Sequence, residues 1–311
     1  VSPTIHTSFE YDNVVSTWLA ENDFDLVHIR QLIWHSISLP RIAKEAGAVV
    51  INSFHDYYTI CPSTKMLDVD GKFHESVCEH PKGFEVSDLW PAGSLPNLTE
   101  DWMSIWRKRF TDALEICDAF VTTSPSARDR IAQFMPKEMA DKFVVIPHGR
   151  DFQRFHQSSQ WPDPDEKFRI LVPGNINRAK GSGVIEALLE RDKDAQRLEF
   201  HILGAHDFDT KQPGLVFHGT YKREEFAERA ARISPHVGAV FSIWDETYCH
   251  TLTEMWAIGL PVIGLDYPTV ATRIRKSGAG WVHDESDLDA LYASMIAELG
   301  DPEEFTEKLM A

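Results

Sequence analysis

A regular alternation of short apolar segments with amphipathic helical segments constrains the fold of this sequence more than any other feature. In the first half, apolar segments lie at residues 25–29, 48–54, 119–123 and 144–146, and helical patterns at 36–46 and 100–117. In the second half, six apolar segments lie at residues 168–172, 198–203, 215–218, 237–242, 261–265 and 280–283, and helical patterns near 181–191, 222–231, 248–258, 269–276 and 286–298. Strands that alternate with helices indicate parallel sheets with helices on both faces. We therefore expect an α/β fold with doubly wound parallel sheets.

A polar stretch rich in proline and serine, residues 157–166, separates the two series and is interpreted as a linker. We accordingly expect an amino-terminal domain over residues 1–156 and a nucleotide-binding domain over residues 167–311. The first series has only three or four strands, fewer than a doubly wound sheet usually has. The amino-terminal domain is therefore expected to be truncated or reduced, with further strands upstream of Val1. The long polar excursion over residues 61–98 is interpreted as a functional flap.

The charge balance argues against one class of partner. Lys and Arg number 31 against 48 Asp and Glu, so the formal net charge is −17, whereas a general nucleic-acid coat needs clustered cations. No apolar run of about 20 residues that would span a membrane occurs. Four cysteines are too few for a disulfide scaffold and indicate a reducing, cytoplasmic location. Cys117 and Cys249 lie in apolar or helical contexts and are expected to be buried thiols.

Four Cys and His residues are close enough in the sequence to suggest a metal site, but their spacing does not match a known zinc motif. Cys61, His74, Cys78 and His80 lack the paired cysteine signature of a zinc site. We therefore expect no metal in this protein.

An aromatic stripe at helical spacing within residues 100–117 includes Trp102 and Trp106 and is expected to lie in the core. Three basic residues, Arg107, Lys108 and Arg109, follow directly. They leave a helix on a membrane surface as the weaker alternative, with peripheral association at the inner face of the membrane.

The first candidate binding segment is residues 173–181, PGNINRAKG, at the end of an expected strand and ahead of an expected helix. Glycines such as Gly174 and Gly181 let a phosphate approach the backbone. Arg178 and Lys180 supply positive charge, and the N-terminus of the following helix adds its dipole. A plain loop with two solvated cations explains the same residues, so spacing alone does not decide.

The second candidate segment is residues 244–254, WDETYCHTLTE. Glu246 is expected in the loop after a strand, and Glu254 about two turns into the next helix. Between them, the backbone amides of Cys249, His250 and Thr251 fall at the helix start, where a diphosphate is favoured. Each carboxylate can accept two hydrogen bonds from neighbouring sugar hydroxyls. Two solvated carboxylates are the alternative interpretation.

Both segments fall at the carboxyl ends of expected strands, which is where open α/β sheets bind ligands. Lys180 and the two glutamates are therefore expected to line one crevice. Their joint occurrence in these places is a stronger signal than either segment alone.

In these motifs the sequence resembles the family-four retaining glycosyltransferases of the GT-B class, which are built of two facing Rossmann-like domains. The resemblance runs from about residue 25 to residue 298. The matching pieces are FDLVHI at 24–29, FHDY at 54–57, VTTS at 121–124, VIPHGRD at 145–151, KG at 180–181, ILG at 202–204, FHGTY at 217–221, the pair Glu246 and Glu254, and AIGLPVI at 257–263. The ordered set is specific, although each piece is weak by itself.

The resemblance implies a role for each matched residue toward a nucleoside diphosphate sugar. Lys180 would pair with the diphosphate and Glu254 with the ribose hydroxyls. Glu246 would hold the transferred sugar, and His55 would reach the same sugar. Gly204, Thr220 and Tyr221 would form a pocket for the base.

The sequence also departs from the family pattern. The family usually has Gly-Arg where this chain has Gly174-Asn175, so Arg178 is the candidate replacement for the missing cation. The family's glycine-rich loop on the acceptor side has no counterpart here.

The function implied is transfer of a sugar, with retention, from a nucleotide donor to a carbohydrate or lipid-linked acceptor in polysaccharide biosynthesis. Cations and a helix dipole facing the diphosphate make a divalent metal unnecessary. The alternative is a non-catalytic module of a larger protein that binds nucleotide sugars or glycans. An epimerase or phosphorylase of GT-B type is a third interpretation.

Overall fold

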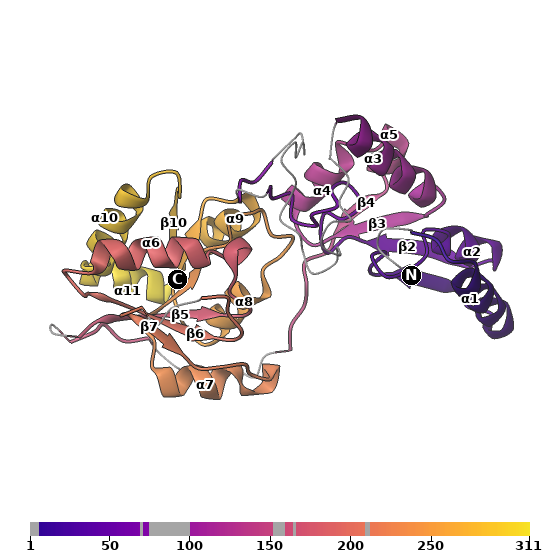
Figure 1. Ribbon diagram of the computed structural model, residues 1–311. Helices are drawn as coiled ribbons and strands as arrows, with labels where there is room; N and C mark the ends of the chain where they lie inside the picture. The colour runs from indigo at the N-terminus through magenta and orange to yellow at the C-terminus, as the bar shows by residue number, and fades with distance from the viewer. Residues whose placement is uncertain (1–5, 69–70, 75–99, 152–158, 164–165, 209–211) are drawn as a thin grey trace. The chain divides into compact units, whose positions relative to one another are not determined.

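The computed structural model describes residues 6–68, 71–74, 100–151, 159–163, 166–208 and 212–311. Its internal contacts divide the chain into two compact units (Figure 1). Unit 1 comprises Val1–His148 together with Glu246–Tyr248, and unit 2 comprises Gly149–Asp245 together with Cys249–Ala311. A short segment from the second half of the sequence is therefore part of the first unit.

Unit 1 contains a parallel sheet of four strands in the order β1-β2-β3-β4. The strands are β1 (Leu26–Ile29), β2 (Val49–Ser53), β3 (Ala119–Thr122) and β4 (Phe143–Val145). These are the four strands expected from the apolar segments. In the register, Ile29 pairs with Asn52 and Ser53 with Val121, so the residues that follow these strands emerge along one edge of the sheet.

Five helices accompany this sheet in the described part of unit 1. They are α1 (Phe9–Asn22), α2 (Leu39–Glu45), α3 (Glu100–Leu114), α4 (Pro125–Ala132) and α5 (Lys137–Ala140). The start of α4 agrees with the sequence, because Pro125 opens the helix and the Ser124 side chain accepts a hydrogen bond from the backbone N–H of Ala127. Helices α1 and α5 were not expected from the sequence.

The aromatic stripe of α3 lies in the core of unit 1, as predicted. Trp106 is buried, and its indole N–H donates to the carbonyl of Tyr58 at 2.8 Å. Trp102 is half-buried and stacks on Trp106, with ring centroids 5.2 Å apart. No helix in the part of the chain that the structure describes is long and apolar enough to cross a membrane.

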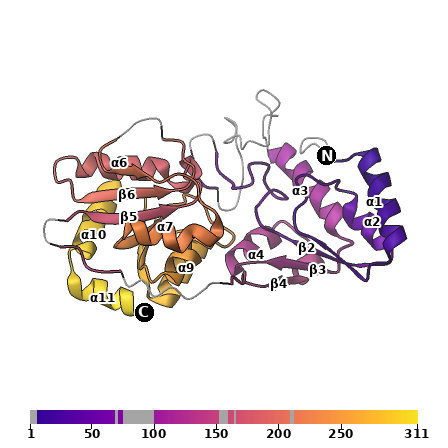
Figure 2. The ribbon, with the colours of Figure 1, turned by 90° about the horizontal axis from the view of Figure 1, so that it is seen from below.

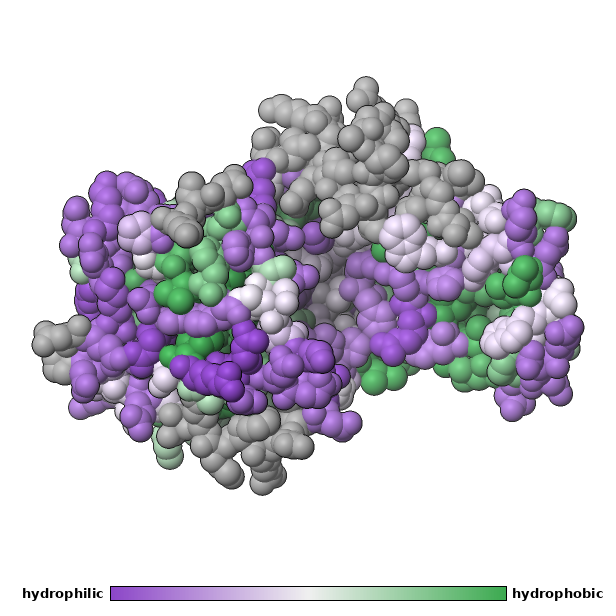
Figure 3. Space-filling model, turned by 60° about the horizontal axis from the view of Figure 1, so that its bottom comes forward, coloured by the Kyte–Doolittle hydropathy of each residue, from purple (hydrophilic) through white to green (hydrophobic). Residues whose placement is uncertain are grey.

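Unit 1 also carries apolar side chains on its surface. Phe9, Val14 and Trp18 of α1 are exposed, as is Leu26 at the start of β1. Trp18 packs against Phe24, with centroids 4.9 Å apart. Figure 3 shows hydrophobic residues on this part of the surface, at the right of the view.

Unit 2 contains a parallel sheet of six strands in the order β10-β9-β8-β5-β6-β7. The strands are β5 (Phe168–Pro173), β6 (Leu198–Leu203), β7 (Leu215–Phe217), β8 (Val237–Val240), β9 (Val262–Leu265) and β10 (Gly280–His283). All six were predicted. The chain runs outward from β5 to β7 and then returns to start again at β8, so the strand order reverses between β5 and β8. Such a reversal point is where an open α/β sheet forms its ligand crevice.

Helices cover both faces of this sheet (Figures 1 and 2). They are α6 (Ser182–Asp192), α7 (Phe226–Ile233), α8 (His250–Ala257), α9 (Pro268–Ser277), α10 (Leu288–Leu299) and α11 (Pro302–Met310), with short 3₁₀ turns η1 (Arg178–Lys180) and η2 (Arg223–Glu225). Helices α6, α10 and α11 pack in one apolar cluster, whereas α7, α8 and α9 pack in another. Because both faces are covered, β8 and β9 are buried at every residue.

Candidate nucleotide site and sugar site

The loops after β5, β6 and β8 meet at the reversal point of the unit 2 sheet through close backbone contacts. Gly204 has φ of +148°, and a Cβ at this residue would lie 1.9 Å from the carbonyl oxygen of Gly174. Gly181 has φ of +86°, and a Cβ there would lie 2.1 Å from the carbonyl oxygen of Phe241. Neither position accommodates a side chain. The predicted glycines therefore bring three strand ends together.

The N-terminus of α8 lies beside the first of these loops. A Cβ built on Gly174 would meet Cγ2 of Thr251 at 3.5 Å, so Gly174 packs on the first turn of α8. The N-terminus of a helix with at least two turns attracts anions through its dipole and its unbonded N–H groups. Gly174, Cys249, His250 and Thr251, all predicted to bind the donor, are thus placed together.

The start of α8 differs from the sequence prediction by about half a turn. Cys249 adopts a left-handed conformation with φ of 68°, so that the helix begins at His250. Glu254 consequently lies one turn into α8, not two. Arg273 holds this turn, because its guanidinium donates to the carbonyl of Cys249 at 2.9 Å and to Oγ1 of Thr253 at 2.5 Å.

The two predicted cations lie on η1, in the loop after β5. Asn177 caps this turn, since its side chain accepts from the backbone N–H of Lys180 at 3.1 Å. Nζ of Lys180 lies over the ring of Trp244, 5.6 Å from its centroid. Arg178 is exposed, and its backbone N–H donates to Asp207. Lys180 is therefore positioned between the loops after β5 and β8, while Arg178 projects toward solvent.

Glu254 is buried and paired with an arginine that the sequence analysis did not assign. Its Oε1 accepts a hydrogen bond from the guanidinium of Arg150, and the two side chains are 7% and 12% exposed. Burial raises the pKa of Glu254, and the nearby charges of Arg150 and Arg223 oppose that rise. The same carboxylate lies close enough to Tyr221 to raise the pKa of its phenol, although burial is the larger cause.

The proximity of Glu254 and Tyr221 places the residue predicted to bind the ribose next to a residue predicted to bind the base. Tyr221 is half-buried and packs against Phe226, with centroids 5.5 Å apart, whereas Thr220 is exposed. Gly204 lies at the end of β6, on the same edge of the sheet. The placement of these residues agrees with a base next to a ribose, and their role in binding stays a prediction.

The two residues predicted to contact the transferred sugar, His55 and Glu246, belong to unit 1. The segment that contains Glu246 is held by two hydrogen bonds from threonines: Oγ1 of Thr247 donates to the carbonyl of His55 at 2.9 Å, and Oγ1 of Thr123 donates to the carbonyl of Thr247 at 2.6 Å. Glu246 itself is buried. His55 and Glu246, which are 191 positions apart in the sequence, are thus brought together at the edge where β2 and β3 end.

His55 is kept neutral by its surroundings. Its ring stacks on that of His148, with centroids 5.2 Å apart and planes 7° from parallel. Burial lowers the pKa of His55 to about 4, helped by the charges of Arg30, His148 and His28. Its Nε2 is buried without a hydrogen-bond partner among the described residues. A neutral imidazole with a vacant nitrogen is suited to exchange a hydrogen bond with a hydroxyl group.

Other sequence predictions have structural outcomes. Cys117 and Cys249 are buried thiols, as expected. Residues 69–70 and 75–98 of the flap, Cys78 and His80 among them, lie outside the described residues, as do residues 157, 158, 164 and 165 of the linker. Within the described ranges no three His, Cys, Asp or Glu side chains converge as a metal site would require.

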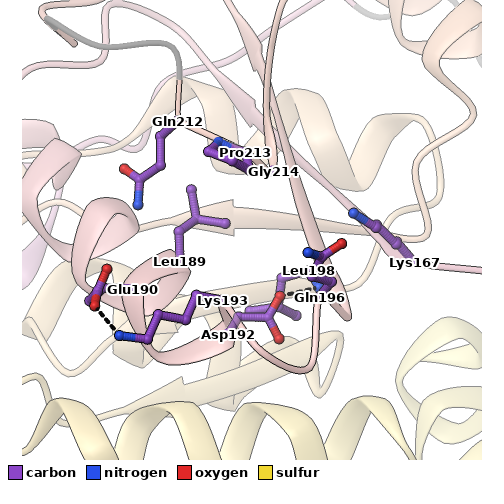
Figure 4. Close-up of a pocket in the computed structure, with 10 residues that line it drawn as sticks. All are labelled: Lys167, Leu189, Glu190, Asp192, Lys193, Gln196, Leu198, Gln212, Pro213 and Gly214. Atoms are coloured by element: carbon purple, nitrogen blue, oxygen red, sulfur yellow. Dashed lines mark hydrogen bonds and ion pairs between the residues drawn. The ribbon is translucent and has the colours of Figure 1, made fainter.

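A separate pocket lies at the opposite edge of the unit 2 sheet, before β5, β6 and β7 (Figure 4). Its lining includes Lys167, Asp192 and Lys193. Asp192 is already used structurally, because its carboxylate accepts from the backbone N–H of Leu198 at 2.8 Å. Lys193 pairs with Glu190 at 2.7 Å. None of the predicted donor residues lines this pocket.

Comparison with known proteins supports the family to which the motifs pointed. The model of the family described as Glycosyltransferase Family 4 matches residues 2–154. A comparison with curated protein sequences finds no match.

Solved structures share the fold across nearly the whole chain. Anabaena Alr3699/HepE, solved in complex with UDP-glucose, is 12% identical with a TM-score of 0.61; the match covers 96% of this chain and 74% of that chain. Sucrose-phosphate synthase from Thermosynechococcus elongatus is 16% identical with a TM-score of 0.65, covering 96% and 70%. A glycosyltransferase from Rickettsia africae is 14% identical with a TM-score of 0.63, covering 97% and 74%. The predicted fold class, two Rossmann-like domains of GT-B type, is confirmed.

Proposed function

We propose that this protein is a retaining glycosyltransferase that moves a sugar from a nucleoside diphosphate sugar to a carbohydrate or lipid-linked acceptor. The observation that carries the proposal is the reversal point of the unit 2 sheet. There, backbone-packed glycines, Lys180 and the N-terminus of α8 converge. That combination provides what a diphosphate requires, which is close backbone approach, a cation and a helix dipole.

The diphosphate is proposed to lie against the backbone of Gly174 and the N–H groups of the first turn of α8. Lys180 would stabilise the negative charge that develops on the leaving group when the bond from the sugar to the phosphate breaks. Because a lysine and a helix dipole already act on that charge, no divalent metal is proposed. Arg178 is exposed at the same turn, where it can supply a second cation.

The ribose is proposed to bind Glu254, and the base to lie toward Tyr221. A buried carboxylate accepts hydrogen bonds from two vicinal hydroxyls without competition from water. The half-buried ring of Tyr221 offers an apolar surface of the kind on which a base can stack.

The transferred sugar is proposed to contact Glu246 and His55. Both are positioned by the same hydrogen bonds of Thr247 in unit 1. Support for this class of donor comes from structural neighbours: Anabaena Alr3699/HepE was solved with UDP, with UDP and glucose, and with UDP-glucose. The pneumococcal O-GlcNAc transferase GtfA was solved with UDP and GlcNAc.

Two measurements test the proposal. Calorimetric titration with UDP, GDP and ADP should detect binding of at least one nucleoside diphosphate. Mass spectrometry should then detect slow hydrolysis or transfer when the sugar derivative of that nucleotide is added. Binding without turnover across a panel of donors and acceptors would favour a non-catalytic module, and the absence of any binding would overturn the proposal.

A further inference from the structure

The pairing of Glu254 with Arg150 goes beyond the roles considered so far. Arg150 lies in the segment after β4 and, by its contacts, belongs to unit 2. It is 104 residues away from its partner in the sequence. With side chains only 12% and 7% exposed, this pair is shielded from water to an extent that surface ion pairs are not.

The two oxygens of Glu254 are not equivalent in this arrangement. Oε1 accepts from Arg150, whereas Oε2 has no hydrogen-bond partner among the described residues. Arg150 in turn keeps a buried Nε–H that has no acceptor within the described part of the chain. The pair therefore has one N–H donor and one carboxylate oxygen without partners among the described residues. A hydroxyl group, which both accepts and donates, is complementary to such a pair.

We infer that Arg150 is a positioning residue that orients Glu254 and keeps it ionised for the ribose hydroxyls of the donor. The inference rests on the proposed nucleotide site and adds to it a residue with no assigned role. A buried carboxylate that loses its cationic partner either takes up a proton or turns away to reach water. In either case the carboxylate no longer accepts hydrogen bonds from two hydroxyls.

The remaining groups around Glu254 do not replace Arg150. Arg223 acts on Glu254 only through its charge and is itself exposed, so solvent screens it. Tyr221 has a pKa raised by burial and by Glu254, so it stays uncharged over the neutral range. Arg150 is therefore the group whose removal changes the charge and the orientation of Glu254 most.

A double-mutant cycle tests the inference with UDP as the probe, or with GDP or ADP if one of these binds better. Arg150→Met should weaken binding by at least about tenfold, as expected for loss of a charge-assisted hydrogen bond, and Arg150→Lys should recover part of the loss. In a Glu254→Gln background the Arg150→Met effect should disappear, because Arg150 acts through Glu254. Arg191→Met is the matched control: Arg191 is an ion-paired arginine of α6, bonded to Asp289 at 2.6 Å.

A pH series separates positioning from a general loss of structure. Relative to the wild type at each pH, Arg150→Met should bind progressively better as the pH rises from about 5 to about 8, since Glu254 then ionises. Dividing the affinity of the variant by that of the wild type at the same pH removes the effect of the nucleotide's own phosphate, whose pKa is about 6. Glu254→Gln should show no such trend.

Each outcome is decisive. The inference is wrong, while the nucleotide site stands, if the wild type and Arg150→Met bind the nucleotide equally well. It is also wrong if Arg150→Met lowers the affinity by the same factor in the Glu254→Gln background as in the wild type. If the wild type binds none of the three nucleotides, the proposed function and the inference fail together.

Discussion

The two units carry different chemistry at the edges where their strands end. In unit 2 the edge is made of backbone: glycines that tolerate no side chain, a helix N-terminus, and Lys180 over Trp244. In unit 1 the edge is made of side chains, with the neutral His55 stacked on His148 and threonines that hold the Glu246 segment. Backbone amides and cations suit a phosphate, whereas a neutral imidazole and a carboxylate suit hydroxyl groups.

The two sheets also differ in how completely their strands are buried. The internal strands β8 and β9 of unit 2 are buried throughout, whereas the internal strands β2 and β3 of unit 1 each contain exposed or half-buried residues. A fully covered sheet fixes its strand ends more firmly than a partly covered one. This difference supports the proposal that unit 2 holds the phosphates of the donor, while unit 1 presents the groups proposed to act on the sugar.

The largest expected effect comes from filling the backbone contact in unit 2. Gly204→Ala should destabilise unit 2 by roughly 3 kcal/mol, because the new Cβ would collide with the carbonyl of Gly174 at a positive φ. Gly183→Ala is the matched control, since Gly183 lies in α6 with nothing within 4 Å of its added Cβ. It should be neutral or stabilise by up to about 1 kcal/mol. Urea unfolding monitored by circular dichroism measures both, and equal stabilities would contradict the role of the close contact.

The next effect concerns binding rather than folding. Lys180→Ala should weaken nucleoside diphosphate binding by roughly 1.5–3 kcal/mol, as expected for loss of a charge-assisted hydrogen bond. Lys193→Ala, which removes an exposed lysine paired with Glu190 in the same unit, should leave the affinity unchanged. Isothermal titration calorimetry makes the comparison. An equal affinity for the wild type and Lys180→Ala would remove the diphosphate from this turn.

A smaller effect is expected in the pH dependence of stability, with one histidine in each unit. Burial lowers the pKa of His55 in unit 1 and of His236 in unit 2 to about 4, from an ordinary value of 6.5. Between pH 6.5 and about 4 the unfolded chain therefore binds more protons than the folded protein. The stability that each neutral histidine contributes is complete above pH 6.5 and is lost as the pH falls toward 4.

Because solvent partly screens the half-buried His55 but not the buried His236, we expect about 1 kcal/mol from His55 and a larger contribution from His236. Urea midpoints measured across this pH range for the wild type, His55→Gln and His236→Gln check the expectation. A wild-type slope that neither substitution reduces would assign the acid sensitivity to other groups.

No effect is expected from chelation. Adding EDTA should leave nucleotide affinity and turnover unchanged, because Lys180 and the α8 dipole are proposed to neutralise the diphosphate. Loss of turnover that manganese or magnesium restores would show that the proposed metal-free mechanism is wrong.

The sequence predicted much of unit 2 and only part of the site. All six strands of unit 2 were visible as apolar runs bounded by turn residues. The edge strand β7 is half-buried, whereas the other five strands are largely buried because helices cover both faces of the sheet. Helix α1 was missed because residues such as Phe9 and Trp18 are exposed rather than aligned on a buried face. The start of α8 was misplaced because nothing in the sequence shows that Cys249 adopts a positive φ.

Long-range pairing is what the sequence does not reveal. Arg150 contacts Glu254 across 104 positions, and Thr247 bonds His55 across 192. Neither contact leaves a periodic or spacing signal, since it depends on how loops after different strands meet in space. The resemblance located Glu254 and His55, and their partners became visible only in three dimensions.

The division of roles between the two glutamates tests the central claim most directly. Glu254→Gln and Glu246→Gln are titrated with the nucleoside diphosphate that the wild type binds best and then assayed with its sugar derivative. We predict that Glu254→Gln loses roughly 1.5–3 kcal/mol of affinity for the free nucleotide, the scale of a buried hydrogen bond to a charged group. Glu246→Gln should bind the free nucleotide like the wild type and lose turnover, because its contact exists only when the sugar is present. Equal losses of nucleotide affinity in the two variants would contradict this account.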